Sequence, residues 1–446
     1  MVKVFKAPKA NRNRQKTQQK TVTIDALDHH GVGVVRSHQP VLFVEGALPG
    51  ERCKVSIQQH KKQYCRGNAI DILEPSESRV LPFCQHSTVC GGCNLDFVQP
   101  DSARQWRRQA ISDLLGRLAN IDQVNWLDDI VSEPLGYRRK TRIAIDARDP
   151  QNILVGYRQA KQRQVFTLQQ CPVLTESLQV LSRSLVEWVK QCPQAKHLGH
   201  ITLFEADDTC LVQVKATREL SQSVITSLTE LGTELECVMQ LQCADKSVET
   251  LAGANSELTY SPIDNINIEI GADDFVQVNH DVNIQMVAQV IAWLEKRSSS
   301  RVLDLFCGTG NFSLAMASKG FQVTGVEGVE TMVERATASA KQYALNQCSF
   351  LHHDLQNPHA VQELLSKDYD AVVLDPSREG AKTVCERLSA NSIQTVVYVS
   401  CNPATFARDA QQLRHNGFEL DAIRFADMFS YTQHAELIAL FTAKVQ

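Results

Sequence analysis

The stretch Val302-Leu-Asp-Leu-Phe-Cys-Gly-Thr-Gly-Asn-Phe312 has the pattern of a buried strand, a glycine-rich turn and the start of a helix. Further apolar runs follow it, with helical stretches between the first four strands; the predicted strands are 301–306, 322–326, 371–374, 395–400, 418–425 and 436–441. Strands that alternate with helices form a mostly parallel sheet with helices on both faces. We therefore predict an α/β, doubly wound, Rossmann-like domain over residues 271–446.

The glycine-rich turn indicates a ligand that lies against the backbone, because glycine leaves room for a close approach. Gly308 and Gly310 form a G-x-G pattern, but the third glycine of a dinucleotide-binding fingerprint is missing and there is no P-loop lysine. Glu327 ends the next strand and is placed to bind ribose hydroxyls, and Asp354 is placed to reach an adenine. Together these residues predict an S-adenosylmethionine site, with NAD as the weaker alternative.

Two further strand ends carry residues suited to catalysis. Asp375 and Pro376 follow one strand, and Cys401 follows the next. Because carboxyl ends of strands in an open α/β sheet face one crevice, both positions are expected beside the glycine-rich turn. A lone cysteine is more often an inert buried thiol, but a strand end favours a nucleophile. Glu436 opens the last strand and is the candidate general base, the alternative being a surface carboxylate.

Residues 271–446 resemble the uracil-C5 RNA methyltransferase family over their whole length. The markers are Gln277-Val-Asn279, the glycine-rich turn, Asp375-Pro-x-Arg378-x-Gly380, Ser400-Cys-Asn-Pro403 with Ala407-Arg-Asp409, and the segment 429–436. The family pattern usually continues the phenylalanine at 429 with a proline, whereas this chain has Ser430. The resemblance therefore leaves the shape of this loop open.

The resemblance implies that the Cys401 thiolate adds to carbon 6 of uracil, that carbon 5 then takes the methyl group, and that Glu436 removes the carbon 5 proton. The target base has to leave its stack to meet the thiol. With the strand ends, the resemblance also predicts the residues that contact S-adenosylmethionine: Gln277, Phe306, Asn311, Glu327, Asp354 and Asp375.

Two other functions stay open. Cytosine-C5 RNA methyltransferases share much of this layout but carry a second cysteine where this chain has Ser377, which disfavours them. A noncatalytic RNA-binding iron–sulfur protein is the other alternative, and the intact Cys401 and Glu436 argue against it.

Four cysteines form a candidate metal site. Cys84, Cys90 and Cys93 have C-x5-C-x2-C spacing, and Cys171 stands before Pro172. Four thiolates suit zinc or an iron–sulfur cluster. The single C-x2-C pair and the Cys-Pro ending favour a [4Fe–4S] cluster with a structural role, and a chance grouping of free cysteines is the alternative.

The N-terminal segment reads as a small barrel. Five short strands are predicted at 21–24, 33–35, 41–44, 53–57 and 68–72, with glycine and proline in the turns. Residues 17–75 resemble a TRAM domain, an RNA-binding module of OB-like barrel type. Residues 1–16 are basic and are predicted to be a disordered tail, with RNA contact as the alternative.

Charge is distributed unevenly along the chain. Residues 1–170 contain 26 Lys and Arg against 16 Asp and Glu, although the whole chain has a net charge of −4. The basic half predicts contact with a polyanion. Residues 76–270 are therefore predicted to be a mixed α+β domain that carries the iron–sulfur cluster and binds RNA. It contains a helix at 101–118 with Arg104, Arg107 and Arg108 on its polar side.

The resemblance names the partner, since family members with both the barrel and the four cysteines modify a uridine of 23S ribosomal RNA. No apolar run is long enough for a membrane helix, and no apolar segment follows the basic N-terminus as in a secretory signal. Most of the 14 cysteines are scattered singly, which favours reduced thiols. We therefore expect a cytoplasmic protein without membrane contact or an obligate protein partner.

Overall fold

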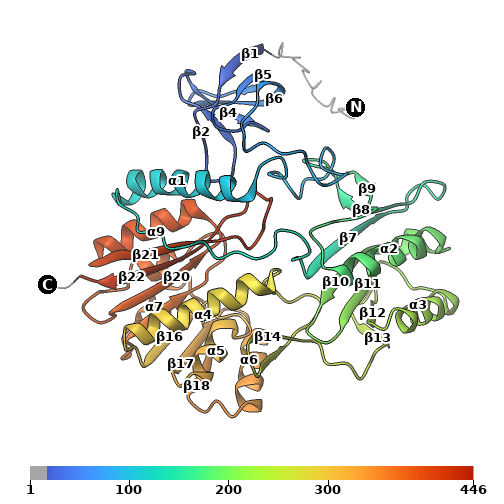
Figure 1. Cartoon of the computed structure of the whole chain (residues 1–446). Coiled ribbons are helices and arrows are strands. Elements are labelled where there is room, and N and C mark those ends of the chain that lie inside the picture. Colours follow the sequence, from blue (N-terminus) through green and yellow to red (C-terminus); the bar gives the residue numbers. More distant parts are fainter. Residues whose placement is uncertain (1–17, 445–446) are drawn as a thin grey trace, which may run out of the picture. The chain divides into compact units, whose positions relative to one another are not determined.

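The computed structural model describes residues 18–444, and the chain divides into two compact units after Arg79 (Figure 1). The predicted basic tail at 1–16 lies outside the described residues. Within 18–444, no helix is both long and apolar enough to cross a membrane.

The N-terminal unit is a six-stranded sheet. Its strands are β1 (Gln18–Thr23), β2 (Ala26–Leu27), β3 (Gly33–Val35), β4 (Val41–Glu45), β5 (Arg52–His60) and β6 (Tyr64–Glu74). The order is β1-β5-β6-β4-β3-β2, and only the β4–β6 pair is parallel. Alternate side chains such as Cys53, Val55 and Ile57 bury one face of the sheet. The five predicted strands are confirmed, and β2 is additional.

A buried carboxylate ties this sheet to the segment that leaves it. Glu51 is fully buried and accepts hydrogen bonds from Arg79 Nε (2.6 Å) and Nη2 (2.8 Å). The backbone amides of Leu48 (2.8 Å) and Ser76 (3.1 Å) also donate to it. Burial alone would raise the pKa of Glu51, but these hydrogen bonds and the charge of Arg79 hold it below its ordinary value.

The second unit contains a central seven-stranded sheet with the order β13-β12-β11-β10-β7-β8-β9. Its strands are β7 (Lys140–Asp146), β8 (Leu154–Arg158), β9 (Val165–Thr167), β10 (Leu198–Glu205), β11 (Cys210–Ala216), β12 (Val238–Gln242) and β13 (Val248–Ala252). The helices here are α2 (Glu176–Gln191), α3 (Gln222–Glu234) and the 3-10 turn η1 (Ala195–His197). Because α2 and α3 contribute apolar residues to the same hydrophobic cluster as the sheet, they bury its inner face.

The C-terminal sheet has the order β18-β17-β16-β19-β20-β22-β21. Its strands are β16 (Arg301–Leu305), β17 (Gln322–Glu327), β18 (Cys348–His352), β19 (Ala371–Leu374), β20 (Thr395–Ser400), β21 (Phe418–Ala426) and β22 (Glu436–Ala443). The other six strands run in one direction, and β22 is antiparallel to them. The predicted doubly wound α/β domain is confirmed.

Helices cover both faces of this sheet. They are α4 (His280–Lys296), α5 (Asn311–Ser318), α6 (Glu330–Gln342), α7 (Pro358–Leu365), α8 (Lys382–Cys385) and α9 (Pro403–His415). One hydrophobic cluster joins the sheet to α4 and α5, and another joins it to α7, α8 and α9. The short hairpin of β14 (Thr259–Ile263) and β15 (Ile266–Glu269) precedes α4.

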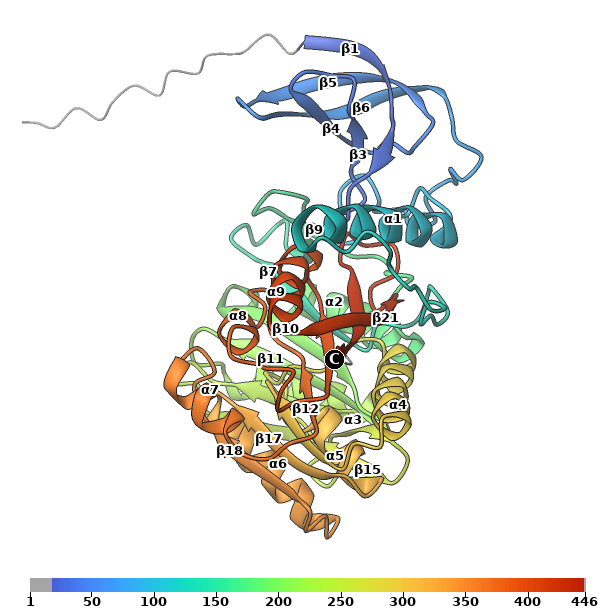
Figure 2. The same cartoon turned by 90° about the vertical axis from the view of Figure 1, so that its left-hand side faces the viewer.

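The segment 100–131 packs on the C-terminal sheet although it precedes the central sheet in the sequence. Helix α1 (Pro100–Ala119) lies beside α9 (Figures 1 and 2), and its Ile111 and Leu115 belong to the same hydrophobic cluster as that helix. Residues 125–130 then pair with β21 in strand fashion. The domain boundaries at 75/76 and 270/271 stay predictions.

One prediction about the arginines of α1 is wrong. Arg107, predicted on the polar side of the helix, is only 2% exposed. Helical periodicity could not reveal this, because the residues that cover Arg107 come from the far end of the chain.

Candidate active site

The strand order reverses at the β16–β19 pair, and this is where an open α/β sheet binds its ligand. The parallel registers pair Leu305 with Val326 on one side and with Leu374 on the other. The residues that follow therefore stand next to one another: Phe306, Glu327 and Asp375. The structure thus brings together three of the six residues predicted to contact S-adenosylmethionine.

The glycine-rich turn adopts backbone angles that its sequence explains. Gly308 and Gly310 have positive φ values of 57° and 97°, which glycine adopts without strain. A Cβ at Gly310 would lie 2.9 Å from Leu314 Cγ, whereas one at Gly308 would meet nothing within 4 Å. The turn is therefore packed closely at Gly310, on its helix side, and has open space beside Gly308.

Glu327 is held in place by backbone amides of this turn and of its own loop. One carboxylate oxygen accepts from Gly308 N (3.1 Å), and the other accepts from Gly328 N (2.8 Å) and Val329 N (3.1 Å). This geometry fixes the carboxylate at the end of β17. Glu327 remains partly exposed, as a residue that binds ribose hydroxyls would have to be.

The other predicted cofactor residues lie around this core. Asn311 opens α5 and exchanges hydrogen bonds with the amide of Asn283 (2.9 and 3.0 Å). Asp354 is exposed two residues beyond the end of β18, next to the strand of Glu327. Gln277 is partly buried in the loop before α4. Contacts of Asn311, Asp354 and Gln277 with the cofactor stay predictions.

Asp304 was not predicted to belong to the site. It is fully buried in β16, where its Oδ2 accepts from the Ser313 hydroxyl and its Oδ1 has no partner among the described residues. Burial raises the pKa of Asp304 to about 7. An acid within the apolar run 302–305 was the available sequence signal, because an unpaired buried carboxylate is costly unless a ligand uses it.

The antiparallel strand β22 places the predicted nucleophile beside the predicted base. Ser400 pairs with Leu437 in the β20–β22 ladder, so Cys401 and Glu436 stand opposite each other at the next position. Directly opposite residues have Cβ atoms about 4.5–5.5 Å apart. The sheet therefore brings Cys401 and Glu436 together at the carboxyl end of β20.

Charges at this end of the sheet oppose ionisation. Burial, then the charges of Glu436 and Asp375, raise the pKa of Cys401 to about 12, and Arg378 acts in the opposite direction. Burial and then Asp375 raise the pKa of Glu436 well above its ordinary value. Burial, followed by the charge of Asp304, raises the pKa of Asp375 to about 7. Carboxyl groups thus gather at the carboxyl end of the sheet, an environment that suits a positively charged ligand.

The loop that follows β19 is fastened to the start of α9. Asn402 caps α9 through Ala404 N (3.1 Å) and donates its amide to the Arg378 carbonyl (2.9 Å). Gly380 has a φ of +77°, and a Cβ there would lie 2.5 Å from Asp409 Oδ2. The motif residues thus fix the Arg378 loop beside Cys401.

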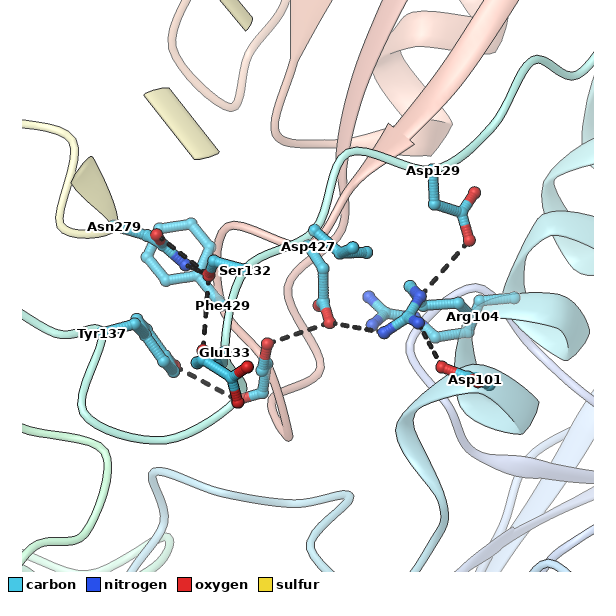
Figure 3. A network of polar contacts seen from close by, with 12 residues as sticks. Asp101, Arg104, Asp129, Ser132, Glu133, Tyr137, Asn279, Asp427 and Phe429 are labelled. Atoms are coloured by element: carbon cyan, nitrogen blue, oxygen red, sulfur yellow. Dashed lines mark hydrogen bonds and ion pairs between the residues drawn. The ribbon is translucent and has the colours of Figure 1, made fainter. Parts of the chain in front are cut away.

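The loop of residues 427–435, here called the Glu436 loop, joins β21 to β22 and leads into the predicted base. Arg104 of α1 forms ion pairs with three carboxylates, those of Asp101, Asp129 (3.3 Å) and Asp427 (3.1 Å) (Figure 3). The Ser430 hydroxyl donates to Asp427 (2.9 Å), and Tyr137 donates to the Ser430 carbonyl (3.1 Å). Ser430 therefore makes a side-chain hydrogen bond that a proline could not make.

The four predicted metal-binding cysteines line one cavity of about 540 Å³. Burial, then the charges of Cys171, Asp96, Cys90 and Cys84, raise the pKa of Cys93 to about 12, so the thiols lie within reach of one another's charge. Within residues 18–444, however, no group of three or more His, Cys, Asp or Glu side chains has the arrangement of a metal site. The four thiols thus share one cavity, and their assignment to a metal stays a prediction.

The doubly wound sheet, the glycine-rich turn and the acidic crevice define the C-terminal domain as a methyltransferase-type α/β domain. Residues 132–444 match the family model described as tRNA (Uracil-5-)-methyltransferase, and residues 13–70 match that of the TRAM domain. The chain belongs to the tRNA (uracil-5-)-methyltransferase family, and both predicted resemblances are confirmed.

Relatives of known name match along the whole chain. The 23S rRNA (uracil(1939)-C(5))-methyltransferase RlmD of Alteromonas mediterranea is 38% identical over 444 residues, which cover 100% of this chain and 92% of that protein. RlmD of Shewanella halifaxensis is 36% identical and matches 100% of both chains. The crystal structure of the Pyrococcus abyssi tRNA (uracil-54, C5)-methyltransferase with S-adenosyl-L-homocysteine has a TM-score of 0.71 at 22% identity. It covers 95% of this chain and 100% of that chain, and it bears out the fold.

Proposed function

We propose that this chain transfers a methyl group from S-adenosylmethionine to carbon 5 of a uridine in 23S ribosomal RNA. The observation that carries this proposal is the placement of Cys401 opposite Glu436 at the carboxyl end of β20, beside the glycine-rich crevice. The RlmD relatives, which match the full length of the chain, support ribosomal RNA as the substrate.

The crevice residues fit the cofactor. The open glycine-rich turn, the anchored Glu327 and the unpartnered Asp304 oxygen would hold a ligand with a ribose and a positive charge. S-adenosylmethionine supplies an electrophilic methyl group when bound. Gln277, Phe306, Asn311, Asp354 and Asp375 complete the proposed contacts.

Cys401 acts first, because carbon 5 of uracil is too weak a nucleophile on its own. The Cys401 thiolate adds to carbon 6, and the electron pair of the carbon 5–carbon 6 double bond moves toward carbon 5, which then takes the methyl group. Thiolate formation requires loss of the Cys401 proton. Arg378 is the neighbouring cation that favours this loss.

Glu436 completes the reaction. Its carboxylate takes the proton from carbon 5, the carbon–hydrogen electron pair restores the double bond, and the bond between Cys401 and carbon 6 breaks. Burial beside Asp375 raises the pKa of Glu436 and makes its ionised form a stronger base.

Mapping of 5-methyluridine in ribosomal RNA tests the proposal. Cells that lack the protein should lose one 5-methyluridine from 23S RNA, and expression of the wild-type chain, but not of Cys401→Ala, should restore it. An unchanged modification map, or the loss of a 5-methylcytidine, would contradict the proposal.

We also propose that Cys84, Cys90, Cys93 and Cys171 hold a [4Fe–4S] cluster. Support comes from the four sulfur donors that line one cavity and from the Cys-Pro ending. The cluster would supply a structural link between residues 84–93 and 171. Anaerobically purified protein should contain about four irons per chain, whereas stoichiometric zinc without iron would refute this assignment.

The basic half of the chain is the proposed RNA-binding part. Arg142, Arg158 and Lys161 line the cysteine cavity, and Lys54, Lys61 and Lys62 are exposed in the N-terminal unit. RNA affinity should therefore fall steeply as salt rises, because each neutralised phosphate of a single strand releases about 0.7 counterions. Affinity that does not depend on salt would exclude this role.

A further inference from the structure

The Glu436 loop is held by residues that come more than 300 positions earlier in the chain. Leu95 N donates to the Tyr431 carbonyl (2.9 Å), and Gln433 N donates to Asn94 Oδ1 (3.3 Å). Phe83 packs against Tyr431 with ring centroids 4.6 Å apart. The segment that carries the cysteines thus contacts the loop directly before the proposed base.

Arg107 makes the most deeply buried of these contacts. Its guanidinium donates to the carbonyls of Thr432 (3.3 Å) and Gln433 (3.1 Å), four and three residues before Glu436. The same group lies over the Phe425 ring, 5.0 Å from its centroid. One buried cation therefore joins α1, the end of β21 and the Glu436 loop.

Packing on Phe425 alone would not require an arginine at this place. A buried guanidinium loses its hydration, and an apolar side chain would pack on Phe425 without that cost. What an apolar side chain cannot do is hold two consecutive carbonyls at fixed positions, which the planar fork of arginine does. The presence of arginine at position 107 therefore indicates that the position of the loop carbonyls matters.

Glu436 needs such support because it stands at the end of its ladder. It is the first residue of β22, and Ser400–Leu437 is the last pair of the β20–β22 ladder within the two strands. On the β21 side Glu436 still pairs with Ala426, but on the β20 side the ladder holds the backbone only from Leu437 onward. The residues before it are held by the loop contacts, and misplacement of a reacting group by about 1 Å can cost about 100-fold in rate.

We propose that Arg107 is a positioning residue for the proton-abstraction step. It fixes the Glu436 loop so that the Glu436 carboxylate reaches the carbon 5 proton of the methylated, Cys401-bound uracil. The inference rests on the proposed function of this site. It assigns Arg107 no part in thiol addition or in methyl transfer.

The test separates proton abstraction from the earlier steps. Turnover of Arg107→Lys and Arg107→Met is measured on a 23S RNA fragment with hydrogen or deuterium at carbon 5 of its uridines. Proton removal should become the slow step, so turnover should fall about 10- to 100-fold and the isotope effect should exceed that of wild type. The rate of adduct formation with 5-fluorouridine RNA should stay unchanged. Lysine keeps the charge but not the fork, so its loss should be the smaller one.

Arg108→Lys is the matched control on the same helix, because Arg108 contacts Asp129 and Trp126 instead of the loop. It should keep the wild-type isotope effect. If Arg107→Met does not fold, Arg107→Lys alone decides the question. A folded Arg107→Lys protein with a wild-type isotope effect overturns the inference, whereas a wild type that forms no 5-methyluridine overturns the proposed function instead.

Discussion

Replacement of Glu436 by glutamine should separate methyl transfer from product release. The side chain keeps its size and loses only its capacity to take a proton. General base catalysis contributes about 10²–10⁴ in rate, which corresponds to about 2.7–5.4 kcal/mol of barrier. Because the wild-type carboxylate is buried beside Asp375, a neutral amide relieves a charge that folding opposes, and thermal stability should not fall.

The assay follows the enzyme on a denaturing gel with a methyl-labelled cofactor. Glu436→Gln should accumulate as a slow band that carries labelled RNA, because the thiol adds and the methyl group transfers but elimination stalls. Cys401→Ala should give neither band nor product. Near-normal turnover of Glu436→Gln without a trapped adduct would assign the base role to another residue.

Four further outcomes are expected. Glu327→Lys should weaken S-adenosylmethionine binding more than about tenfold in calorimetry, because it replaces the anchored carboxylate by a cation, and unchanged affinity would remove Glu327 from the site. Gly310→Ala should cost about 1–3 kcal/mol of stability through contact with Leu314 and reduce cofactor affinity, which thermal unfolding with and without cofactor would show. Glu51→Gln should destabilise the N-terminal sheet by about 3–5 kcal/mol near neutral pH. Because the folded pKa of Glu51 is lowered, that penalty should shrink in denaturant titrations as the pH falls below about 4.5, and a penalty independent of pH would contradict the assignment. Wild-type turnover should rise with pH above neutrality, since the raised pKa values of Cys401 and Glu436 leave little of either group ionised there, and a flat pH profile would contradict this.

The local sequence pattern was sufficient to predict most of the C-terminal strands and to identify the residues that follow them. The predicted strand 371–374 coincides with β19, and 395–400 coincides with β20. The glycine-rich turn could be located because its backbone has positive φ angles, which glycine adopts far more readily than other residue types. Strand β18, which positions Asp354, is short and less apolar, and it was not predicted as a strand.

Long-range partners could not be predicted in the same way. The sequence placed Cys401 and Glu436 at strand ends, but their pairing depends on the insertion of β22 between β20 and β21, which no local pattern encodes. From its position in the helix, Arg107 was predicted to face solvent, and its burial follows from contacts with the distant Glu436 loop and Phe425. The cysteine spacing likewise identified four candidate metal ligands, but it could not predict how their thiols are arranged in space.

The pairing of residues 125–130 with β21 has a consequence for how the protein is made. Leu127 N donates to the Ile423 carbonyl (2.9 Å) and Ile130 N to the Phe425 carbonyl (2.8 Å), so this segment occupies the open edge of the C-terminal sheet. The side-chain amide of Asn125 bonds to the carbonyl of Asp421, 296 residues further along the chain.

A ribosome adds about 5–20 residues per second, so roughly 15–60 s separate the synthesis of the two partners. During that time the segment 125–130 and the hydrophobic side of α1 have no sheet to cover, and contacts of such separation form late. Once β21 emerges, its edge offers unpaired backbone groups to any other strand until the waiting segment docks. The open edge of the C-terminal sheet is thus covered by a segment that was synthesised early. The nascent chain is most prone to aggregation just before this segment docks on β21.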